Sequence, residues 1–223
     1  MKNPGVIAGL RREAACLDGL PVLSAGASAA RACQLAAQLL AGGCDGLISF
    51  GTAGGLDPAL APGTLVVADR VIRPDGQSLA VDADWRHQIL ASIGGAEEGA
   101  DFQISKGSLA GSDQLLSGVQ AKADLFAKTG ARAVDMESHA VAEIAHAQGV
   151  PFLALRAIAD PADFALPNCV AHAVGPGGEV RILSILGVLI PRLGELGRLR
   201  ILARHSRASL TTLCFAARHL NSG

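Results

Sequence analysis

Residues 131–163, ARAVDMESHAVAEIAHAQGVPFLALRAIADPAD, decide the fold that we expect for this chain. An apolar strand ends in the acidic cluster Asp135-Met136-Glu137, a segment with helical period follows, and a second apolar strand ends at Asp160. Strand, helix and strand in this order are the unit of a parallel sheet, in which ligands bind beyond the carboxyl ends of the strands. We therefore expect Glu137 and Asp160 to face one crevice.

The helical segment inside this stretch has one apolar face, and its polar side chains are expected on other faces, at the surface. The apolar face is formed by Ala140, Val141, Ile144 and Ala145, whereas His139, Glu143 and His146 are the polar members. No HExxH pattern is formed, so we expect no metal site here.

The first expected strand, residues 5–10, ends just before a third acid, Glu13. An acid at this position is typical of a solvated first helical turn, and it is also placed to reach the crevice. The strand at residues 45–50 runs into Gly51-Thr52-Ala53-Gly54-Gly55, where backbone N–H groups can converge on a polar ligand. This run has neither the Lys-Ser/Thr pair of a Walker A loop nor the spacing of a dinucleotide fingerprint.

A second strand is expected at residues 20–25, followed by a helix with Ser28 as its N-cap and Gly42-Gly43 as its end. Arg31 would lie in the first turn, where a cation opposes the helix dipole unless an anion binds there. The alternative is that Arg31 simply extends into water.

The remaining segments continue the alternation of strands and helices. We expect a strand at residues 63–72, a surface helix at 83–93 that contains Trp85, a strand and polar turn at 107–116, and a helix at 117–128. Leu115 and Leu116 are candidates for an apolar wall of the crevice, with core packing as the alternative. The pattern predicts an α/β fold with a largely parallel sheet.

Composition limits the other possibilities. The chain has 223 residues, half of them apolar, with 3% aromatic residues and no Tyr, so one domain with a core of Ala, Leu, Val and Ile is expected. A net charge of -1 does not indicate a nucleic-acid partner. The five cysteines are widely spaced and form no CxxC pair, which predicts core residues rather than metal ligands or disulfides: Cys16, Cys33, Cys44, Cys169 and Cys214.

The C-terminal residues, 192–223, form a basic tail beyond a domain at residues 1–191. In this tail six arginines stand against a single acid, Glu195. A helix at 179–190 closed by Pro191 is expected first, then a tail helix with Leu199, Leu202, Ser206, Leu210 and Leu213 on one face. Such a helix packs on a domain or lies on an anionic membrane surface. No signal peptide is indicated and the longest apolar run, 182–190, is half a membrane span, so we expect a cytoplasmic protein, with peripheral contact to the inner membrane through the tail as an alternative.

Three blocks of sequence resemble the purine nucleoside phosphorylase and nucleosidase superfamily. They are GVIAGLRREA at residues 5–14, ISFGTAGGLDPALAPGTLVVAD at 48–69, and VDMESHAVA with RAIADPAD across 134–163. The resemblance is strongest to the methylthioadenosine/S-adenosylhomocysteine nucleosidase branch. It implies a single-domain α/β/α sandwich with a mixed, largely parallel sheet, no cofactor beyond phosphate as a co-substrate, and a homodimer or larger assembly.

The resemblance also implies roles for individual residues. Asp160 becomes the acid that donates to N7 of the purine, Glu137 the ligand of the ribose 2′-hydroxyl, and Glu13 the carboxylate that positions the nucleophile. The remaining implied contacts are to the ribose (Met136), the nucleophile and ribose side (Thr52, Ala53, Gly54), the base side (Leu115, Leu116, Asp135) and phosphate (Arg31).

The chemistry agrees with two of these roles. Cleavage of an N-ribosidic bond passes through an oxocarbenium-like state, which calls for an acid at the departing base and negative charge near the ribose. Asp160 donates near neutral pH only if burial raises its pKa above the usual value of about 3.9. Glu137 is expected to stay ionised.

Less specific features of the sequence resemble those of the hopanoid-associated phosphorylases, which are linked to removal of adenine from adenosylhopane. These features are the DMES wording, an Arg-rich helical tail and a short segment between Glu13 and Gly26, which implies a more open site. Ser49 and Phe50 stand where phosphorolytic hexameric relatives place an arginine, which argues against phosphorolysis. The alternative is that Arg31, Arg11 or Arg12 takes the place of that arginine, so water and phosphate both remain as nucleophiles. Two alternatives are a nucleosidase for methylthioadenosine or S-adenosylhomocysteine, and a nucleoside-binding scaffold without catalysis.

Overall fold

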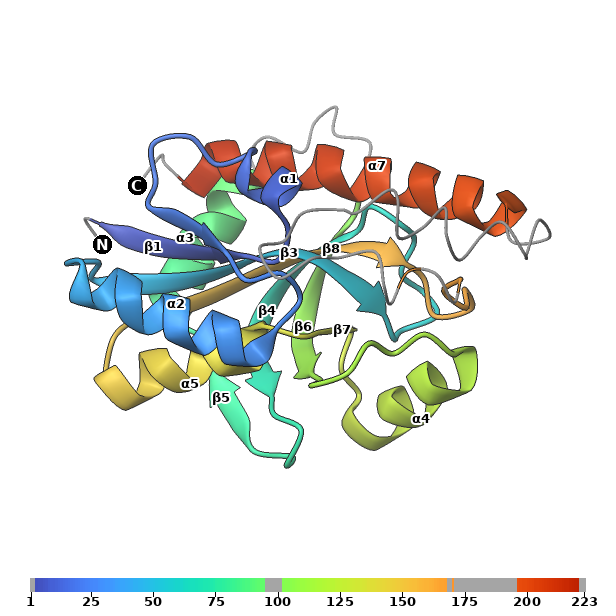
Figure 1. Cartoon of the computed structure of the whole chain (residues 1–223), viewed down its shortest axis with the longest axis horizontal. Coiled ribbons are helices and arrows are strands. Elements are labelled where there is room, and N and C mark those ends of the chain that lie inside the picture. Colours follow the sequence, from blue (N-terminus) through green and yellow to red (C-terminus); the bar gives the residue numbers. More distant parts are fainter. Residues whose placement is uncertain (1–2, 95–101, 168–169, 171–195, 221–223) are drawn as a thin grey trace.

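A mixed sheet with helices on both faces forms the centre of the molecule in a computed structural model that describes residues 3–94, 102–167, 170 and 196–220 (Figure 1). Its strands are β1 (Pro4–Ala8), β2 (Val22–Ser24), β3 (Gly46–Gly55), β4 (Leu65–Ile72), β5 (Ser78–Ala80), β6 (Ile104–Gly111), β7 (Ala133–Asp135) and β8 (Phe152–Asp160). The helices are α1 (Arg11–Ala14), α2 (Ala29–Ala41), α3 (Ala83–Gly94), α4 (Val119–Thr129), α5 (Ser138–Gln148) and α7 (Leu196–Leu220).

The strand order is β2-β1-β3-β7-β6-β4-β5, and β8 pairs with both β3 and β4. Strand β3 pairs in parallel with β1 and β8, while β7 runs antiparallel to β3, and β5 and β8 run antiparallel to β4. One core lies under α2 and α5 and a second lies under α3 and α7, so the sheet is covered on both faces. The predicted α/β sandwich with a mixed, largely parallel sheet is confirmed.

The glycine-rich run was expected to leave the sheet after Phe50, but β3 continues through it to Gly55. Pairing with β8 extends as far as Gly54 opposite Asp160, and backbone hydrogen bonds therefore hold the glycines in the strand. Gly51 also leaves room for side chains, because a Cβ there would lie 2.6 Å from Arg156 Nη1 and from Glu13 Oε2. The glycine-rich run is therefore part of the strand, where it lets neighbouring side chains pack closely, and it does not form a loop.

The sequence predicted both ends of α2 correctly, and it predicted α3 but not the burial of its tryptophan. The Ser28 side chain accepts the backbone N–H of Arg31 at 3.3 Å, and α2 ends at Gly42 as its C-cap. Helix α3 forms where expected, but the prediction of a surface helix was wrong for Trp85, which is only 8% exposed and packs in the core between the sheet and α7.

The C-terminal half of α7 packs on the sheet. Leu213, Ala216, Ala217 and Leu220 are buried, and the Thr212 hydroxyl donates a hydrogen bond of 2.8 Å to the Gly63 carbonyl. Toward the helix start, Leu199 and Leu202 are only half-buried. The expected helix at 179–190 and the boundary at Pro191 lie outside the described residues. Within the described part, no helix has the length and apolar content to cross a bilayer.

A disulfide joins Cys16, just after α1, to Cys214 in α7. The prediction that all five cysteines are core residues was therefore wrong for these two, because 198 positions separate them and only the packing of α1 against α7 brings them together. Cys33 and Cys44 are free and half-buried, while Cys169 lies outside the described residues.

We expect Cys214→Ser to lower the free energy of unfolding by about 2 to 5 kcal/mol, because the bond closes a loop of nearly the whole chain. Urea denaturation of the oxidised protein measures this loss. Cys33→Ser, which removes a free thiol, is the control and is expected to change the unfolding midpoint much less. Equal midpoints for Cys214→Ser and the unmodified protein would contradict the prediction, as would failure of reduction to release two additional thiols in denaturant.

Candidate active site

A cavity of about 150 Å³ opens at the ends of β3, β7 and β8. Its lining includes ten of the eleven predicted site residues: Glu13, Thr52, Ala53, Gly54, Leu115, Leu116, Asp135, Met136, Glu137 and Asp160. Arg31 is exposed and is not part of this lining, so the structure gives no support to its role in binding phosphate. The sheet thus brings together residues that lie far apart in the sequence. The expected parallel strand-helix-strand unit is not formed, because β7 runs antiparallel to β3 and β8.

Glu13 enters the cavity from α1 and is only 1% exposed. Its Oε2 accepts the backbone N–H of Leu10 at 2.7 Å, and its Oε1 accepts the backbone N–H and the hydroxyl of Thr52 at 3.1 and 2.7 Å. The alternative of a solvated acid is therefore excluded. Three donors fix the orientation of this carboxylate, which ties α1 to β3.

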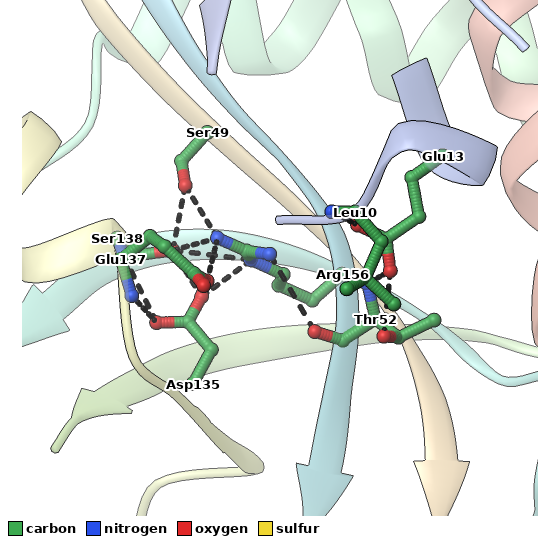
Figure 2. Close-up of polar contacts among 8 residues, drawn as sticks. All are labelled: Leu10, Glu13, Ser49, Thr52, Asp135, Glu137, Ser138 and Arg156. Atoms are coloured by element: carbon green, nitrogen blue, oxygen red, sulfur yellow. Dashed lines mark hydrogen bonds and ion pairs between the residues drawn. The ribbon is translucent and has the colours of Figure 1, made fainter. Parts of the chain in front are cut away.

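Arg156 in the middle of β8 is the residue that sequence reasoning missed at the centre of the site. The guanidinium is fully buried and lies between the acidic cluster on one side and the Thr52–Glu13 pair on the other (Figure 2). It donates to Ser49 Oγ at 2.6 Å, forms an ion pair with Asp135, and approaches Glu137 Oε2 at 3.3 Å. The available signal was a single charge inside an otherwise apolar buried strand.

Asp135 organises the start of α5. Its Oδ1 accepts the backbone N–H groups of Glu137 and Ser138 at 3.3 and 3.0 Å, and its Oδ2 contacts the Ser138 hydroxyl and Arg156. A carboxylate that accepts these free N–H groups stabilises the helix start. The contacts of Asp135 are thus made to the protein, although the residue also lines the cavity.

Glu137 is 4% exposed and shares a single guanidinium with Asp135. Burial raises the pKa of Glu137 to about 7, against the lowering effect of Arg156, and the nearby charges of Asp135 and Glu13 raise it further. This raised pKa works against the expected ionisation of Glu137, whose charge against a ribose stays a prediction. One cation, Arg156, serves three buried carboxylates, and Glu137 lies farther from it than Asp135 does, which agrees with the raised pKa of Glu137.

Asp160 ends β8 and is 7% exposed. Burial raises its pKa to about 6, while Lys122 opposes this shift through an ion pair of 2.6 Å between Nζ and Oδ2. The direction agrees with the requirement for an acid that donates near neutral pH. Lys122 comes from α4 and is a second residue that sequence reasoning missed.

Two leucines form an apolar wall of the cavity. Leu116 is half-buried and packs against the small core around Leu56 and Val134, while Leu115 exposes 41% of its surface. Each of the two alternatives therefore describes part of the wall: Leu116 packs in a core and also lines the cavity, whereas Leu115 is available to a ligand.

One of the polar side chains of α5, most of which were predicted at the surface, is buried. His139 is 5% exposed, and its Nε2 lies 3.2 Å from Asp113 Oδ1. Gly111 makes this placement possible, because a Cβ there would come within 2.5 Å of the ring. Within the described ranges, no group of three or more His, Cys, Asp or Glu side chains is arranged to hold a metal ion.

Comparison with known families agrees with this geometry. The model of the family described as "Phosphorylase superfamily" matches residues 16–173. The chain belongs to the phosphorylase superfamily. The match begins after Glu13 and ends before α7, so two features of this superfamily member, the first acid and the packed tail, lie outside it.

A curated relative matches this chain in sequence, and solved structures share its fold at low identity. The 5′-methylthioadenosine/S-adenosylhomocysteine nucleosidase of Mycobacterium tuberculosis is 32% identical over 162 residues, which cover 56% of this chain and 64% of that protein. The chain thus matches slightly less than two thirds of the length of this relative. The nucleosidase of Neisseria meningitidis, solved with methylthio-immucillin-A, has a TM-score of 0.73 at 18% identity with full coverage of both chains. The futalosine hydrolase of Helicobacter pylori has a TM-score of 0.69 at 18% identity, covering 96% of each chain.

Proposed function

We propose that this protein hydrolyses the N-ribosidic bond of an adenine nucleoside. One observation carries the proposal: a buried acid with a raised pKa, Asp160, shares one cavity with a buried group of carboxylates around Arg156. Departure of a purine requires a proton on the base and negative charge near the ribose. The two halves of this cavity meet these two requirements.

In the proposed reaction Asp160 donates its proton to N7 while the bond between C1′ and N9 breaks and its electron pair passes to the base. Glu137, in its ionised form, accepts a hydrogen bond from the 2′-hydroxyl and stabilises the positive charge that develops on the ribose. Water, oriented by Glu13, adds to C1′ and releases a proton through that carboxylate. The products are adenine and a free ribosyl compound.

The charge of the cavity favours water over phosphate as the nucleophile. Four carboxylates line it, namely Glu13, Asp135, Glu137 and Asp160, and Arg156 is the only cation among its lining residues. This arginine already pairs with Asp135 and Glu137. A phosphate dianion would meet like charges without a free cation, and like charges repel strongly at low dielectric.

Methylthioadenosine and S-adenosylhomocysteine are the substrates that we propose first, because a relative in sequence and a solved structure with this fold are nucleosidases named for these compounds. Adenosylhopane is the second candidate. One observation favours it: the exposed Leu115 extends the apolar wall at the cavity, where a lipid substituent would bind. A nucleoside-binding scaffold without catalysis is the remaining alternative. The buried acids Glu13, Glu137 and Asp160 argue against it.

We propose a cytoplasmic protein that acts as a homodimer or larger assembly, with the arginines of α7 as the place for any peripheral contact with a membrane. Cytoplasmic thiols are kept reduced. In that compartment the pair Cys16–Cys214 is expected to be open, and the molecule to have the lower stability predicted for Cys214→Ser. Liposome flotation of the full chain, compared with a variant in which the exposed Arg200, Arg204 and Arg207 of α7 are replaced by Gln, measures membrane contact.

The direct test is incubation of the purified protein with methylthioadenosine or adenosylhopane, with and without phosphate, followed by chromatography of adenine and of the sugar. Hydrolysis predicts adenine and a free ribosyl product at the same rate in both buffers. A ribosyl 1-phosphate would show phosphorolysis. Binding without any adenine release would support the scaffold and overturn the proposal.

The rate of adenine release is expected to follow a bell-shaped pH profile with its maximum between pH 6 and 7. Glu137 must be ionised and has a pKa of about 7, so activity is lost toward acid. Asp160 must be protonated and has a pKa of about 6, so activity is lost toward alkali. kcat/KM measured from pH 5 to 9 reports both groups in the free enzyme. A flat profile across this range would contradict the assignment.

A further inference from the structure

Lys122 lies fully buried in α4, a helix whose other face is exposed to solvent. Its Nζ donates to Asp160 Oδ2 at 2.6 Å and to the carbonyl oxygens of Asp160, Pro161 and Phe164 at 3.3, 2.9 and 3.1 Å. A buried ammonium group is costly unless acceptors surround it. This site is therefore built around the cation, and it holds the end of β8 and the turn that follows.

The two oxygens of Asp160 have different surroundings. Oδ2 is held by Lys122, whereas no hydrogen bond from the described part of the protein reaches Oδ1. The side chain of Asp160 is 11% exposed, and this residue lines the cavity. Oδ1 is thus the oxygen that remains for a ligand.

The other charged groups of the cavity are engaged with one another. Asp135 and Glu137 contact Arg156, and Glu13 is held by Leu10 and Thr52. Within the described residues, Lys122 is the charged side chain that contacts Asp160, and it reaches Asp160 from α4 rather than from the strands. The two halves of the site therefore have separate cations.

We propose that Lys122 is a positioning residue that holds Oδ2 of Asp160 and thereby assigns the acidic proton to Oδ1, the oxygen that faces the departing base. This inference rests on the proposed function. An ammonium group only donates hydrogen bonds, so Oδ2 acts as an acceptor whether or not Asp160 is protonated. The proton then occupies Oδ1, from which it passes to N7 as the C1′–N9 bond breaks.

After the transfer, Asp160 is a carboxylate and the positive charge of Lys122 stabilises it. The same charge opposes the effect of burial and keeps the pKa of Asp160 near 6 in the unmodified protein. Without the ammonium group, burial acts alone and the pKa of Asp160 rises further. Lys122 therefore affects both the position of the proton and the pH range in which it is available.

Lys122→Met and Lys122→Gln test this inference, with Lys128→Met as the control, because Lys128 is an exposed lysine of the same helix. We expect the pH optimum of adenine release to move to higher pH in both neutral variants, since the pKa of Asp160 loses a lowering of roughly 1 to 3 units. Lys122→Arg retains the charge, and we expect its pH optimum to move by less than half as much as in the neutral variants. Lys128→Met is expected to leave the pH optimum unchanged. An unmoved optimum in a folded neutral variant would overturn the inference.

A second measurement does not require turnover. In protein labelled with ¹³C at aspartate carboxyl groups, the signal lost in Asp160→Asn identifies Asp160, and its titration midpoint is expected to rise in Lys122→Gln and not in Lys128→Met. An unchanged midpoint would overturn the inference. Failure of the unmodified protein to release adenine, combined with the expected rise in this midpoint, would instead refute the proposed function and leave the ion pair established.

Discussion

Asp160→Asn is expected to lower the rate of adenine release by roughly 100- to 10,000-fold, the usual contribution of a general acid. The amide keeps an oxygen that accepts the hydrogen bond from Lys122, but it has no acidic proton for N7. Steady-state kinetics with methylthioadenosine at pH 6.5 measures the loss. The effect should fall mainly on kcat, because the proton is transferred in the transition state and not on binding.

The matched control is Asp163→Asn, which changes an exposed acid three residues further along the chain. We expect it to retain the rate of the unmodified protein. Thermal denaturation of both variants shows whether each is folded at the assay temperature. Turnover within threefold of the unmodified protein in a folded Asp160→Asn variant would refute the role of Asp160 as the acid.

Arg156→Met is expected to lower the free energy of unfolding by about 3 to 5 kcal/mol, the usual cost of removing one partner from a buried ion pair. The substitution leaves Asp135 and Glu137 buried without a cation. Ionised Glu137 then lacks its cation, and the pKa of Glu137 already lies above its unfolded value. A carboxyl with a raised pKa in the folded state destabilises the fold as pH rises, so the loss should be larger at pH 8 than at pH 5.5.

Urea denaturation at these two pH values measures the effect of Arg156→Met. Arg70→Met is the control, because Arg70 lies on the neighbouring strand β4 with 53% of its side chain exposed. An exposed pair of this kind contributes little to stability, so the control is expected to change it by less than about 1 kcal/mol. A loss from Arg156→Met that is the same at both pH values would contradict the proposed charge balance.

The carboxyl ends of the strands were predictable from sequence, and so was their convergence. Apolar runs that stop at Glu137 and Asp160 carry their own boundary signal, and both acids line one cavity. The expected reason, two parallel strands whose carboxyl ends meet at one edge, was wrong, because β7 runs antiparallel to β3 and therefore to β8. The N-terminal acid was less certain, since Glu13 is buried only because Thr52 and Leu10 donate to it. Position along the chain did not decide between burial and solvation.

The partners of the site residues were not predictable from the pattern. Lys122 lies 38 positions before Asp160, in a helix whose charged residues resemble a solvated face. The disulfide partners are still farther apart, and burial of His139 depends on a missing Cβ at Gly111. Such contacts depend on which faces meet in three dimensions, which the periodicity of one segment does not specify.

Strand β3 is paired in parallel on both sides, with Ala8 opposite Phe50 in one register and Asp160 opposite Gly54 in the other. Backbone hydrogen bonds therefore fix the distance between the end of β1, which precedes Glu13, and Asp160 at the end of β8. A register shift between Ala53 and Gly54 changes the pairing by one residue. Inserting a residue into β3 would displace Glu13, which follows β1, from Asp160, which ends β8, by about 3.3 Å. The wall that includes Leu115, by contrast, comes from a segment between β6 and α4 that carries no such register. Substitutions in this wall can thus change which substrates the proposed site accepts without altering the distance between Glu13 and Asp160.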